Sequence, residues 1–552
     1  MTQKNTLRAA DHLVDLLQAQ GTKAVFGVPG ESYLPVLDAF YGRDPDIRFV
    51  TCRQEGGAAM AAEAYGKLTG RPGICFATRG PGATNASAGV HVAFQDSTPM
   101  ILFLGQVARD MVDREAFQEI DYRRMFGQMA KWVAQIDDAS RLQEYVSRAF
   151  RTAMSGRPGP VVLALPEDML YDDIAQPVAP AWAEAPRFMP VAQTLEAVKG
   201  RIADARAPLI MAGGGGWTST GIAALERFAE TQGLPVAVSL RCQGLMNNSH
   251  PNYVGHYGVG TPPYLATLME QTDLLIAIGP RLGEMTTNGY ALLSAPVPTQ
   301  NLIHVFPEPE ELGRVFEPEI AVTSDTQSFC EAVAAWKPID PDLFASRTET
   351  LRAEFERFTV PDSVPDDPLA PYFAHLADVL PDTAIVCNGA GNYAGWLHRF
   401  YRYRSPGSQL APTSGSMGYG LPAAIGAAIC APDREIVAIA GDGCFMMTCQ
   451  EMATAVHHGL DLTVIVIDNG RYGTIRVHQE RAYPGRVSGT DLANPDFCAF
   501  ARSFGAQATA VQDLASFTAA VAKARATPGV SLIHVIADPD FLAPGKTLSN
   551  MG

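Results

Sequence analysis

A carboxylate and an amide follow two neighbouring apolar runs near the end of the chain. Asp442 stands between two glycines directly after the run 435–440, and Asn469 comes shortly after the next run, 461–467. Carboxylate and amide oxygens suit Mg²⁺, which commonly shares its coordination shell with a phosphate. Gly-Asp-Gly alone indicates an ordinary turn. The asparagine at the matching place after the next run instead favours a site for a metal ion and a phosphate.

These two residues can meet only if particular elements position them. The runs 435–440 and 461–467 read as buried strands, and residues 444–459 read as a helix that ends at Gly459. A right-handed crossover places two such strands parallel and side by side, so their carboxyl ends lie at one edge of a sheet. The helix that begins near Cys444 turns its positive end toward that edge, where it suits a phosphate.

The same alternation of strands and helices runs through the whole chain. Its 552 residues are too many for one hydrophobic core and indicate about three domains. Proline-rich stretches at 175–190 and 360–373 divide this alternation of strands and helices into three parts. We therefore predict an α/β fold of three tandem domains with mainly parallel sheets, at residues 1–180, 190–345 and 365–552.

Composition and charge argue against several classes of protein. The net charge of −16 repels nucleic acid and anionic membranes, so we expect neither as a partner. The sequence has no apolar run long enough to cross a membrane, and its N-terminus lacks the apolar core of a signal peptide. Nine scattered cysteines without a Cys-x-x-Cys pair favour reduced thiols in the cytoplasm.

The segment Gly441-Asp442-Gly443, the helix and strand after it, and Asn469 resemble the binding motif of thiamine diphosphate enzymes. The resemblance implies bound thiamine diphosphate and a Mg²⁺ ion held by the Asp442 and Asn469 side chains and the Arg471 carbonyl. It covers the whole chain. It implies a pyrimidine-binding domain first, a Rossmann-like middle domain, and a diphosphate-binding domain last.

A second carboxylate, Glu55, lies between the apolar run 47–52 and an alanine-rich helix. Alone, a carboxylate at the start of a helix is explained by the helix dipole. The surrounding segment, 53–73, resembles the family's pyrimidine-binding domain. It implies that Glu55 hydrogen-bonds N1′ of the cofactor's aminopyrimidine and so promotes loss of the proton at thiazolium C2. This role is general acid–base catalysis by a partly desolvated carboxyl group.

Further segments resemble the family in the expected order. Phe117 and Gln118 lie in the stretch that faces the reaction centre. Met417 lies where the family has a large apolar residue under the cofactor, although methionine is also an ordinary core residue. The other cofactor contacts that the resemblance implies are Gly30, Thr78, Gly82, Asn85, Asn392, Tyr393, Gly415, Gly441, Gly443, Cys444, Tyr472, Gly473 and Thr474.

Overall the chain resembles the acetolactate synthase group most, whose members decarboxylate pyruvate and join the product to a second 2-keto acid. His478 stands where that group has a tryptophan that selects the second substrate, and we include it among the candidate catalytic residues. A histidine in this setting is as often a surface residue. Glu167 stands where the group has a lysine. Residues 279–289 and 303–312 resemble its flavin-binding segments only loosely, so we expect no FAD.

Two other classes of function stay open. One is a different thiamine diphosphate lyase, which would be a 2-keto acid decarboxylase, an aldehyde lyase or a sulfoacetaldehyde acetyltransferase-type enzyme. The other is a non-catalytic nucleotide-binding homologue. The presence of Glu55, Asp442 and Asn469 argues against that second class.

The resemblance also implies partners. Glu55 and Asp442 fall in different domains, and in this family such residues meet across a subunit interface, which implies at least a homodimer and permits a homotetramer. The substrates would be small 2-keto acids or aldehydes. The loop 470–486 carries four arginines, which suit an anionic substrate in an otherwise acidic protein.

Overall fold

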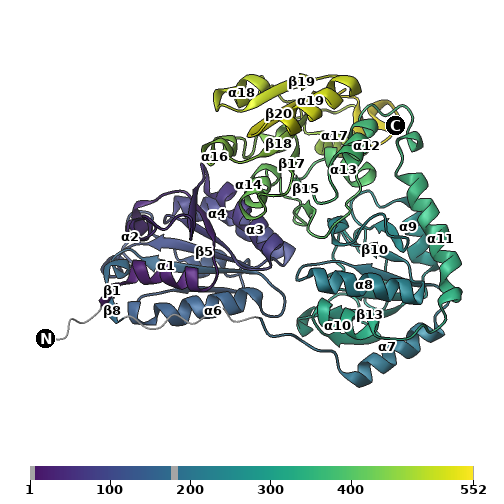
Figure 1. The fold of residues 1–552 in the computed structure, drawn as a ribbon, viewed down its shortest axis with the longest axis horizontal. Coiled ribbons are helices and arrows are strands. Elements are labelled where there is room, and N and C mark those ends of the chain that lie inside the picture. The colour runs from purple at the N-terminus through teal and green to yellow at the C-terminus, as the bar shows by residue number, and fades with distance from the viewer. Residues whose placement is uncertain (1–5, 176–184, 551–552) are drawn as a thin grey trace.

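The computed structural model describes residues 6–175 and 185–550, and it contains three six-stranded sheets. Each sheet uses a consecutive part of the chain, and helices separate most of its strands. Figure 1 shows them as three units, the first in purple and blue, the middle one in teal, and the third in green and yellow. The predicted fold of three tandem α/β domains is therefore confirmed.

The first sheet has the strand order β3-β2-β4-β5-β7-β6, with all neighbours parallel. Its strands are β2 (Ala24–Gly27), β3 (Arg48–Thr51), β4 (Gly73–Ala77), β5 (Met100–Gln106), β6 (Trp132–Gln135) and β7 (Pro160–Pro166). Its helices are α1 (Ala9–Ala19), α2 (Leu34–Ala39), α3 (Glu55–Thr69), α4 (Pro81–Asp96), α5 (Tyr122–Phe126) and α6 (Leu142–Met154). The strands β5 and β7 are buried along their whole length because α1, α2 and α6 cover one face and α3, α4 and α5 the other.

The middle sheet has the order β11-β10-β9-β12-β13-β14 and is also parallel throughout. Its strands are β9 (Pro208–Ala212), β10 (Val236–Val238), β11 (Tyr253–His256), β12 (Leu274–Ile278), β13 (Asn301–Phe306) and β14 (Ile320–Thr323). Its helices are α7 (Ala192–Asp204), α8 (Ser219–Gln232), α9 (Pro263–Gln271), α10 (Thr326–Ala334) and α11 (Pro341–Phe358). The order reverses at β9, and such a reversal opens a crevice at the carboxyl ends of the strands.

The third sheet has the order β16-β15-β17-β18-β20-β19, again parallel. Its strands are β15 (Ile385–Asn388), β16 (Gln409–Leu410), β17 (Ile436–Gly441), β18 (Leu462–Asp468), β19 (Gln507–Val511) and β20 (Val530–Ile536). Its helices are α12 (Ala370–Val379), α13 (Tyr393–Phe400), α14 (Gly420–Cys430), α15 (Asp442–Phe445), α16 (Glu451–His457), α17 (Gly473–Ala482), α18 (Phe497–Ser503) and α19 (Leu514–Ala526).

The strands β17 and β18 are adjacent and parallel, with Gly441 opposite Ile467. Their predicted arrangement is therefore confirmed. The single helix predicted over 444–459 is wrong, because the chain forms two short helices there, α15 and α16. The Thr448 hydroxyl donates to the Gly418 carbonyl at 2.6 Å and holds the intervening segment in a turn.

The first and third domains share one hydrophobic core, and α3 packs on α14 where they meet (Figure 1). Both helices are rich in alanine and glycine, so their backbones approach closely. A Cβ at Gly426 of α14 would overlap the Ala61 carbonyl oxygen of α3. The fit between the two helices therefore depends on the absence of a side chain at this position.

A buried charge cluster lies beside this contact. The Glu63 side chain is fully buried and accepts hydrogen bonds from the Tyr419 hydroxyl at 2.5 Å and the Thr98 hydroxyl at 2.7 Å. Lys67 forms ion pairs with Glu63 and with Asp96. Burial lowers the pKa of Lys67, but Asp96 and Glu63 more than offset this and raise it. The cluster thus joins the two domains by paired rather than isolated buried charges.

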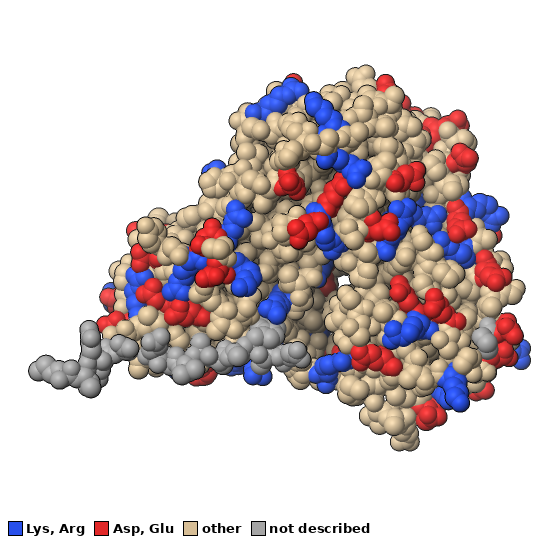
Figure 2. All heavy atoms as spheres, viewed as in Figure 1, with Lys and Arg blue, Asp and Glu red and all other residues tan. Residues whose placement is uncertain are grey.

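The surface carries both signs of charge. Figure 2 shows Lys and Arg side chains interspersed with Asp and Glu side chains over the visible face. Among the helices of residues 6–175 and 185–550, none is both long and apolar enough to cross a membrane.

Substituting Gly426 by alanine tests the close contact between α3 and α14. The added methyl group must displace backbone, so we expect Gly426→Ala to destabilise the domains by about 1–3 kcal/mol, the usual cost of overpacking. Differential scanning calorimetry would show this as a lower transition temperature. The matched control is Gly200→Ala in α7, where a Cβ meets no atom within 4 Å and alanine is the better helix former. Equal melting of both variants and the wild type would contradict the prediction.

Candidate active site

The turn after β17 positions Asp442 as the first residue of α15. Its two neighbouring glycines are packed against tyrosine rings. A Cβ at Gly441 would lie 2.9 Å from Cδ1 of Tyr393, and a Cβ at Gly443 would lie 2.5 Å from Cε1 of Tyr472. The glycines are therefore needed for the close approach of both rings to this turn.

The Asp442 carboxylate is buried, with only 3% of the residue exposed. Its Oδ2 accepts a hydrogen bond from Asn494 Nδ2 at 2.7 Å, and the same amide donates to Asp468 Oδ1 at 2.8 Å. Burial raises the pKa of Asp442 to about 6, and the Asp468 carboxylate contributes to the rise. None of the ion pairs among the described residues includes Asp442. A bound cation would balance the charge of this carboxylate.

Polar side chains from two other loops lie beside this turn. The Thr474 hydroxyl donates to Asn392 Oδ1 at 2.8 Å. A Cβ at Gly473 would lie 3.3 Å from Asn469 Nδ2 and 4.0 Å from Asn392 Nδ2. The Arg471 carbonyl, which already accepts from Gly473 N at 2.9 Å, belongs to the same loop. One carboxylate, amide oxygens and a backbone carbonyl make a donor set that fits Mg²⁺.

Cys444 connects this turn to the segment before α14. Its Sγ lies 3.5 Å from the Tyr393 hydroxyl and accepts from Gly418 N at 3.2 Å. Met417 is half-buried and packs against the shared core. Gly415 is exposed and has φ = 69°. Below, the Asp442 group means Asn392, Tyr393, Gly415, Met417, Gly441, Asp442, Gly443, Cys444, Asn469, Arg471, Tyr472, Gly473 and Thr474.

The second carboxylate, Glu55, is the first residue of α3 and is 8% exposed. Asn85 Nδ2 donates to Glu55 Oε2 at 2.9 Å, and a Cβ at Gly82 would lie 3.2 Å from Oε1. The Gln54 side chain caps the helix by accepting from Gly57 N at 3.0 Å. The carboxyl group of Glu55 is thus held at a helix start in a mostly dry environment.

The remaining predicted residues of the first domain lie in the segments that follow β2, β4 and β5. Thr78 Oγ1 lies 2.9 Å from Ser32 Oγ, and a Cβ at Gly30 would lie 2.5 Å from Thr78 Cβ. Gln118 has φ = 66°, and its neighbour Phe117 is 75% exposed. We call Gly30, Glu55, Thr78, Gly82, Asn85, Phe117 and Gln118 the Glu55 group.

No hydrogen bond or ion pair of residues 6–175 and 185–550 joins the Glu55 group to the Asp442 group. A different side chain connects their supporting helices. Glu451, the first residue of α16, is 1% exposed. Its carboxylate accepts from Arg53 N at 3.2 Å and Gln54 N at 3.0 Å, directly before Glu55. The segment that begins with Asp442 therefore packs on the start of α3 through Glu451.

Comparison with known proteins shows the family of the three domains. Residues 7–125 match the N-terminal domain, residues 195–333 the central domain and residues 389–535 the C-terminal domain of thiamine pyrophosphate enzymes. This chain belongs to the thiamine pyrophosphate enzyme family. Thiamine pyrophosphate is another name for thiamine diphosphate, so the predicted family is confirmed.

Three relatives within the family are named as acetolactate synthase subunits. The acetolactate synthase large subunit of Corynebacterium glutamicum is 33% identical over 94% of this chain and 85% of the relative. The isozyme 2 large subunit of Escherichia coli K12 is 31% identical over 99% of both chains. The large subunit of Parasynechococcus marenigrum is 31% identical over 99% of this chain and 91% of the relative. The predicted likeness to acetolactate synthases is therefore confirmed.

The prediction of a loop over 470–486 is wrong for most of that segment of this thiamine pyrophosphate enzyme, because residues 473–482 form α17. An ion pair one helical turn apart, Arg476 Nη2 to Glu480 Oε2 at 2.6 Å, stabilises that helix. His478 lies on the exposed side of α17. Its inclusion among the catalytic residues stays a prediction.

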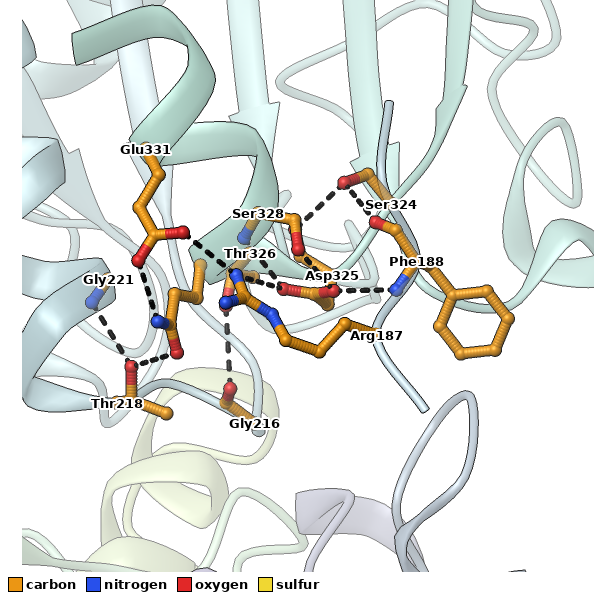
Figure 3. Close-up of polar contacts among 11 residues, drawn as sticks. Arg187, Phe188, Gly216, Thr218, Gly221, Ser324, Asp325, Thr326, Ser328 and Glu331 are labelled. Carbon is orange, nitrogen blue, oxygen red and sulfur yellow. Dashed lines mark hydrogen bonds and ion pairs between the residues drawn. The ribbon is translucent and has the colours of Figure 1, made fainter. Parts of the chain in front are cut away.

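A cavity of about 1100 Å³ lies at the carboxyl ends of the middle strands and reaches both outer domains. Figure 3 shows its edge, where the chain entering the middle domain is fixed to the start of α10. Asp325 accepts from Phe188 N at 2.8 Å and from Ser328 N at 2.7 Å, and Arg187 pairs with Glu331 at 3.0 Å. The cavity has the size of small-molecule sites. The expected absence of FAD stays a prediction.

Three further residues beside the two groups, Glu451, Asn494 and Asp468, were not predicted from the sequence. Glu451 and Asn494 contact residues far from them in the sequence, and a single acidic or amide residue on an otherwise ordinary segment gives no local signal. Asp468 had one available signal, since it directly precedes Asn469 at the end of β18. A polar pair at the end of a buried strand is where ligands of open sheets bind.

Replacing Glu451 tests its hold on the start of α3. Glu451→Ala removes the acceptor of two backbone N–H groups, so we expect Arg53 and Gln54 to exchange their amide hydrogens faster in the cofactor-free protein. Hydrogen exchange with mass spectrometry measures this. Glu63→Gln is the matched control, because Glu63 is an equally buried carboxylate at the same domain contact but two turns further along α3. Unchanged exchange at 53–54 in Glu451→Ala would refute the assignment.

Proposed function

We propose that this chain is a Mg²⁺- and thiamine diphosphate-dependent enzyme that decarboxylates a 2-keto acid, with pyruvate as first candidate. It would join the remaining carbon group to an acceptor, in the manner of its relatives that are named acetolactate synthases. The observation that carries the proposal is the pair of buried carboxylates. Glu55 begins α3, and Asp442 begins α15, each in a domain that matches one cofactor-binding domain of the family.

The cofactor would be held through the Asp442 group. We assign the metal to the Asp442 and Asn469 side chains and the Arg471 carbonyl, which is supported by the uncompensated burial of Asp442. The remaining members of that group line the approach to this turn.

Glu55 would carry the acid–base step. When bound, thiamine diphosphate supplies a carbon nucleophile and stabilises the carbanion that decarboxylation leaves. The Glu55 carboxyl would exchange a proton with the ring nitrogen N1′, while Asn85 orients it through Oε2. Its position at the start of α3, 8% exposed and held by Asn85, supports this role, because an acid–base group must be fixed within hydrogen-bond reach of its partner. Phe117 and Gln118 would face the substrate.

The proposed assembly of subunits follows from the separation of the Glu55 group and the Asp442 group within the described chain. We propose a homodimer or homotetramer in which the Glu55 group of one subunit meets the Asp442 group of another. Large apolar side chains exposed beside the two groups support an interface at this place. They are Phe117, Met446, Met447, Ile475 and Tyr483.

Related expectations belong to this proposal. The domains would span residues 1–180, 190–345 and 365–552, each with one of the three sheets. The nine cysteines are free thiols, which supports a cytoplasmic location. We expect no flavin absorbance in the purified protein. A different thiamine diphosphate lyase remains the second candidate, because Glu167 and His478 depart from the acetolactate synthase pattern.

A product screen tests the proposed reaction. The protein, loaded with thiamine diphosphate and Mg²⁺, would be incubated with single and paired 2-keto acids and followed by NMR. We expect CO₂ release from pyruvate together with a carbon–carbon coupled product. Turnover of an aldehyde or acyloin without CO₂ release from any 2-keto acid would favour the lyase and overturn the proposal.

Two reciprocal variants test the assigned roles. Glu55→Gln should bind thiamine diphosphate normally but slow hydrogen–deuterium exchange at C2 of the bound cofactor by about 10²–10⁴-fold, the usual worth of one acid–base group. Asp442→Ala should lose cofactor affinity without unfolding. Calorimetry and quenched NMR provide the two measurements. Wild-type exchange in Glu55→Gln, or unchanged affinity in Asp442→Ala, would disprove the respective role.

A further inference from the structure

A charge pair crosses the carboxyl edge of the first sheet. Arg79 follows β4 and Glu167 follows β7, and β5 lies between these two strands. Arg79 Nη1 lies 3.3 Å from Glu167 Oε2. The pair therefore spans the end of β5 at the same sheet edge at which Glu55 follows β3.

Most of the hydrogen-bonding capacity of Arg79 is unused within the described chain. The residue is 9% exposed, and its Nε is buried without a partner. Its side chain donates none of the hydrogen bonds found among residues 6–175 and 185–550. A guanidinium has five donors, and Nε and one terminal nitrogen form an edge that matches a carboxylate. A buried donor without a partner is costly, so this edge calls for an anionic ligand.

The backbone around Arg79 is fixed on both sides. Before it, Thr78 lies 2.9 Å from Ser32 through their hydroxyl oxygens. After it, Gly80 N donates to the Tyr122 hydroxyl at 3.2 Å, and that hydroxyl donates to the Gly105 carbonyl at 3.1 Å. The guanidinium is therefore carried by a rigid segment, as a precise binding contact requires.

The same segment lies at the reacting end of the Glu55 group. The Arg79 guanidinium lies 6.0 Å from the centre of the Phe117 ring. A Cβ at Gly80 would lie 2.8 Å from the Gln118 carbonyl oxygen, and Gly82 adjoins the Glu55 carboxyl. Arg79 is thus surrounded by residues that the proposed function assigns to the substrate side of the site.

We propose that Arg79 is a specificity-determining residue that binds the carboxylate of a 2-keto acid substrate through its Nε edge. Glu167 holds the opposite side, Nη1, and so fixes the orientation of the guanidinium. A planar carboxylate satisfies the free edge, whereas a neutral aldehyde leaves it unpaired. This inference rests on the proposed function, because it assumes that the Glu55 group faces the substrate.

Oxamate, an isostere of pyruvate that cannot be decarboxylated in the same way, separates binding from chemistry. Calorimetric titration of the protein loaded with thiamine diphosphate and Mg²⁺ should give an affinity about 10- to 100-fold weaker in Arg79→Gln than in the wild type, the range for a charged hydrogen-bonded pair. Arg79→Lys keeps the charge and the bulk but not the planar edge, so its affinity should be intermediate.

Arg109→Gln is the matched control. Arg109 lies at the same sheet edge, but its donors are used by Asp168 at 2.7 Å, the Asp137 carbonyl at 2.9 Å and Asp172 at 3.1 Å. Its replacement should leave oxamate affinity unchanged. In turnover assays Arg79→Gln should raise KM for a 2-keto acid acceptor and leave KM for propanal unchanged.

The outcomes separate this inference from the proposed function. Equal oxamate affinity in the wild type, Arg79→Gln and Arg79→Lys, including no binding by any of them, overturns the role of Arg79. A loss of oxamate affinity in Arg79→Gln together with failure of every 2-keto acid to release CO₂ leaves the carboxylate contact standing and overturns the proposed reaction. Circular dichroism spectra of the variants would show that each is folded.

Discussion

The contact between α3 and α14 is the constraint on which the rest of the structure depends. It is made by glycine and alanine, and a single methyl group at Gly426 would meet backbone of the opposite helix. Because the two helices cannot slide past such a fit, the contact fixes how α3 lies against the third domain. Glu55 is the first residue of this helix, and Glu451 of the third domain holds the backbone directly before it.

The buried charged side chains fall into two sets with different roles. Glu63, Lys67 and Asp96 are buried in mutual contact, so their charges are paired within the chain. Asp442 is buried beside another carboxylate and one amide. Arg79 is buried, and its Nε has no hydrogen-bond partner among the described residues. The paired groups hold the domains together, whereas Asp442 and Arg79 lie at the carboxyl edges of two sheets, where ligands bind.

The sequence was a good guide wherever local pattern decides the outcome. Apolar runs such as 435–440 and 461–467 predicted strands, and their spacing predicted that Asp442 and Asn469 follow neighbouring parallel strands. The pattern did not reveal that 444–459 breaks into two helices, because Thr448 bonds to Gly418 on a different element. The pattern also did not reveal the role of Glu451 or the ion pair between Glu167 and Arg79. Contacts between distant segments cannot be predicted from the spacing of nearby residues.

The shared core of the first and third domains has a consequence for shortened forms of the chain. Apolar residues from β2 to β20 form one continuous cluster, whereas the middle domain has two clusters of its own. The first domain has a further cluster of its own on the opposite face of its sheet, so the shared cluster covers only the face that carries α3. A fragment ending before the third domain would expose the face of α3 that packs on α14, so one side of the first sheet would lose part of its cover while the other side kept its own core.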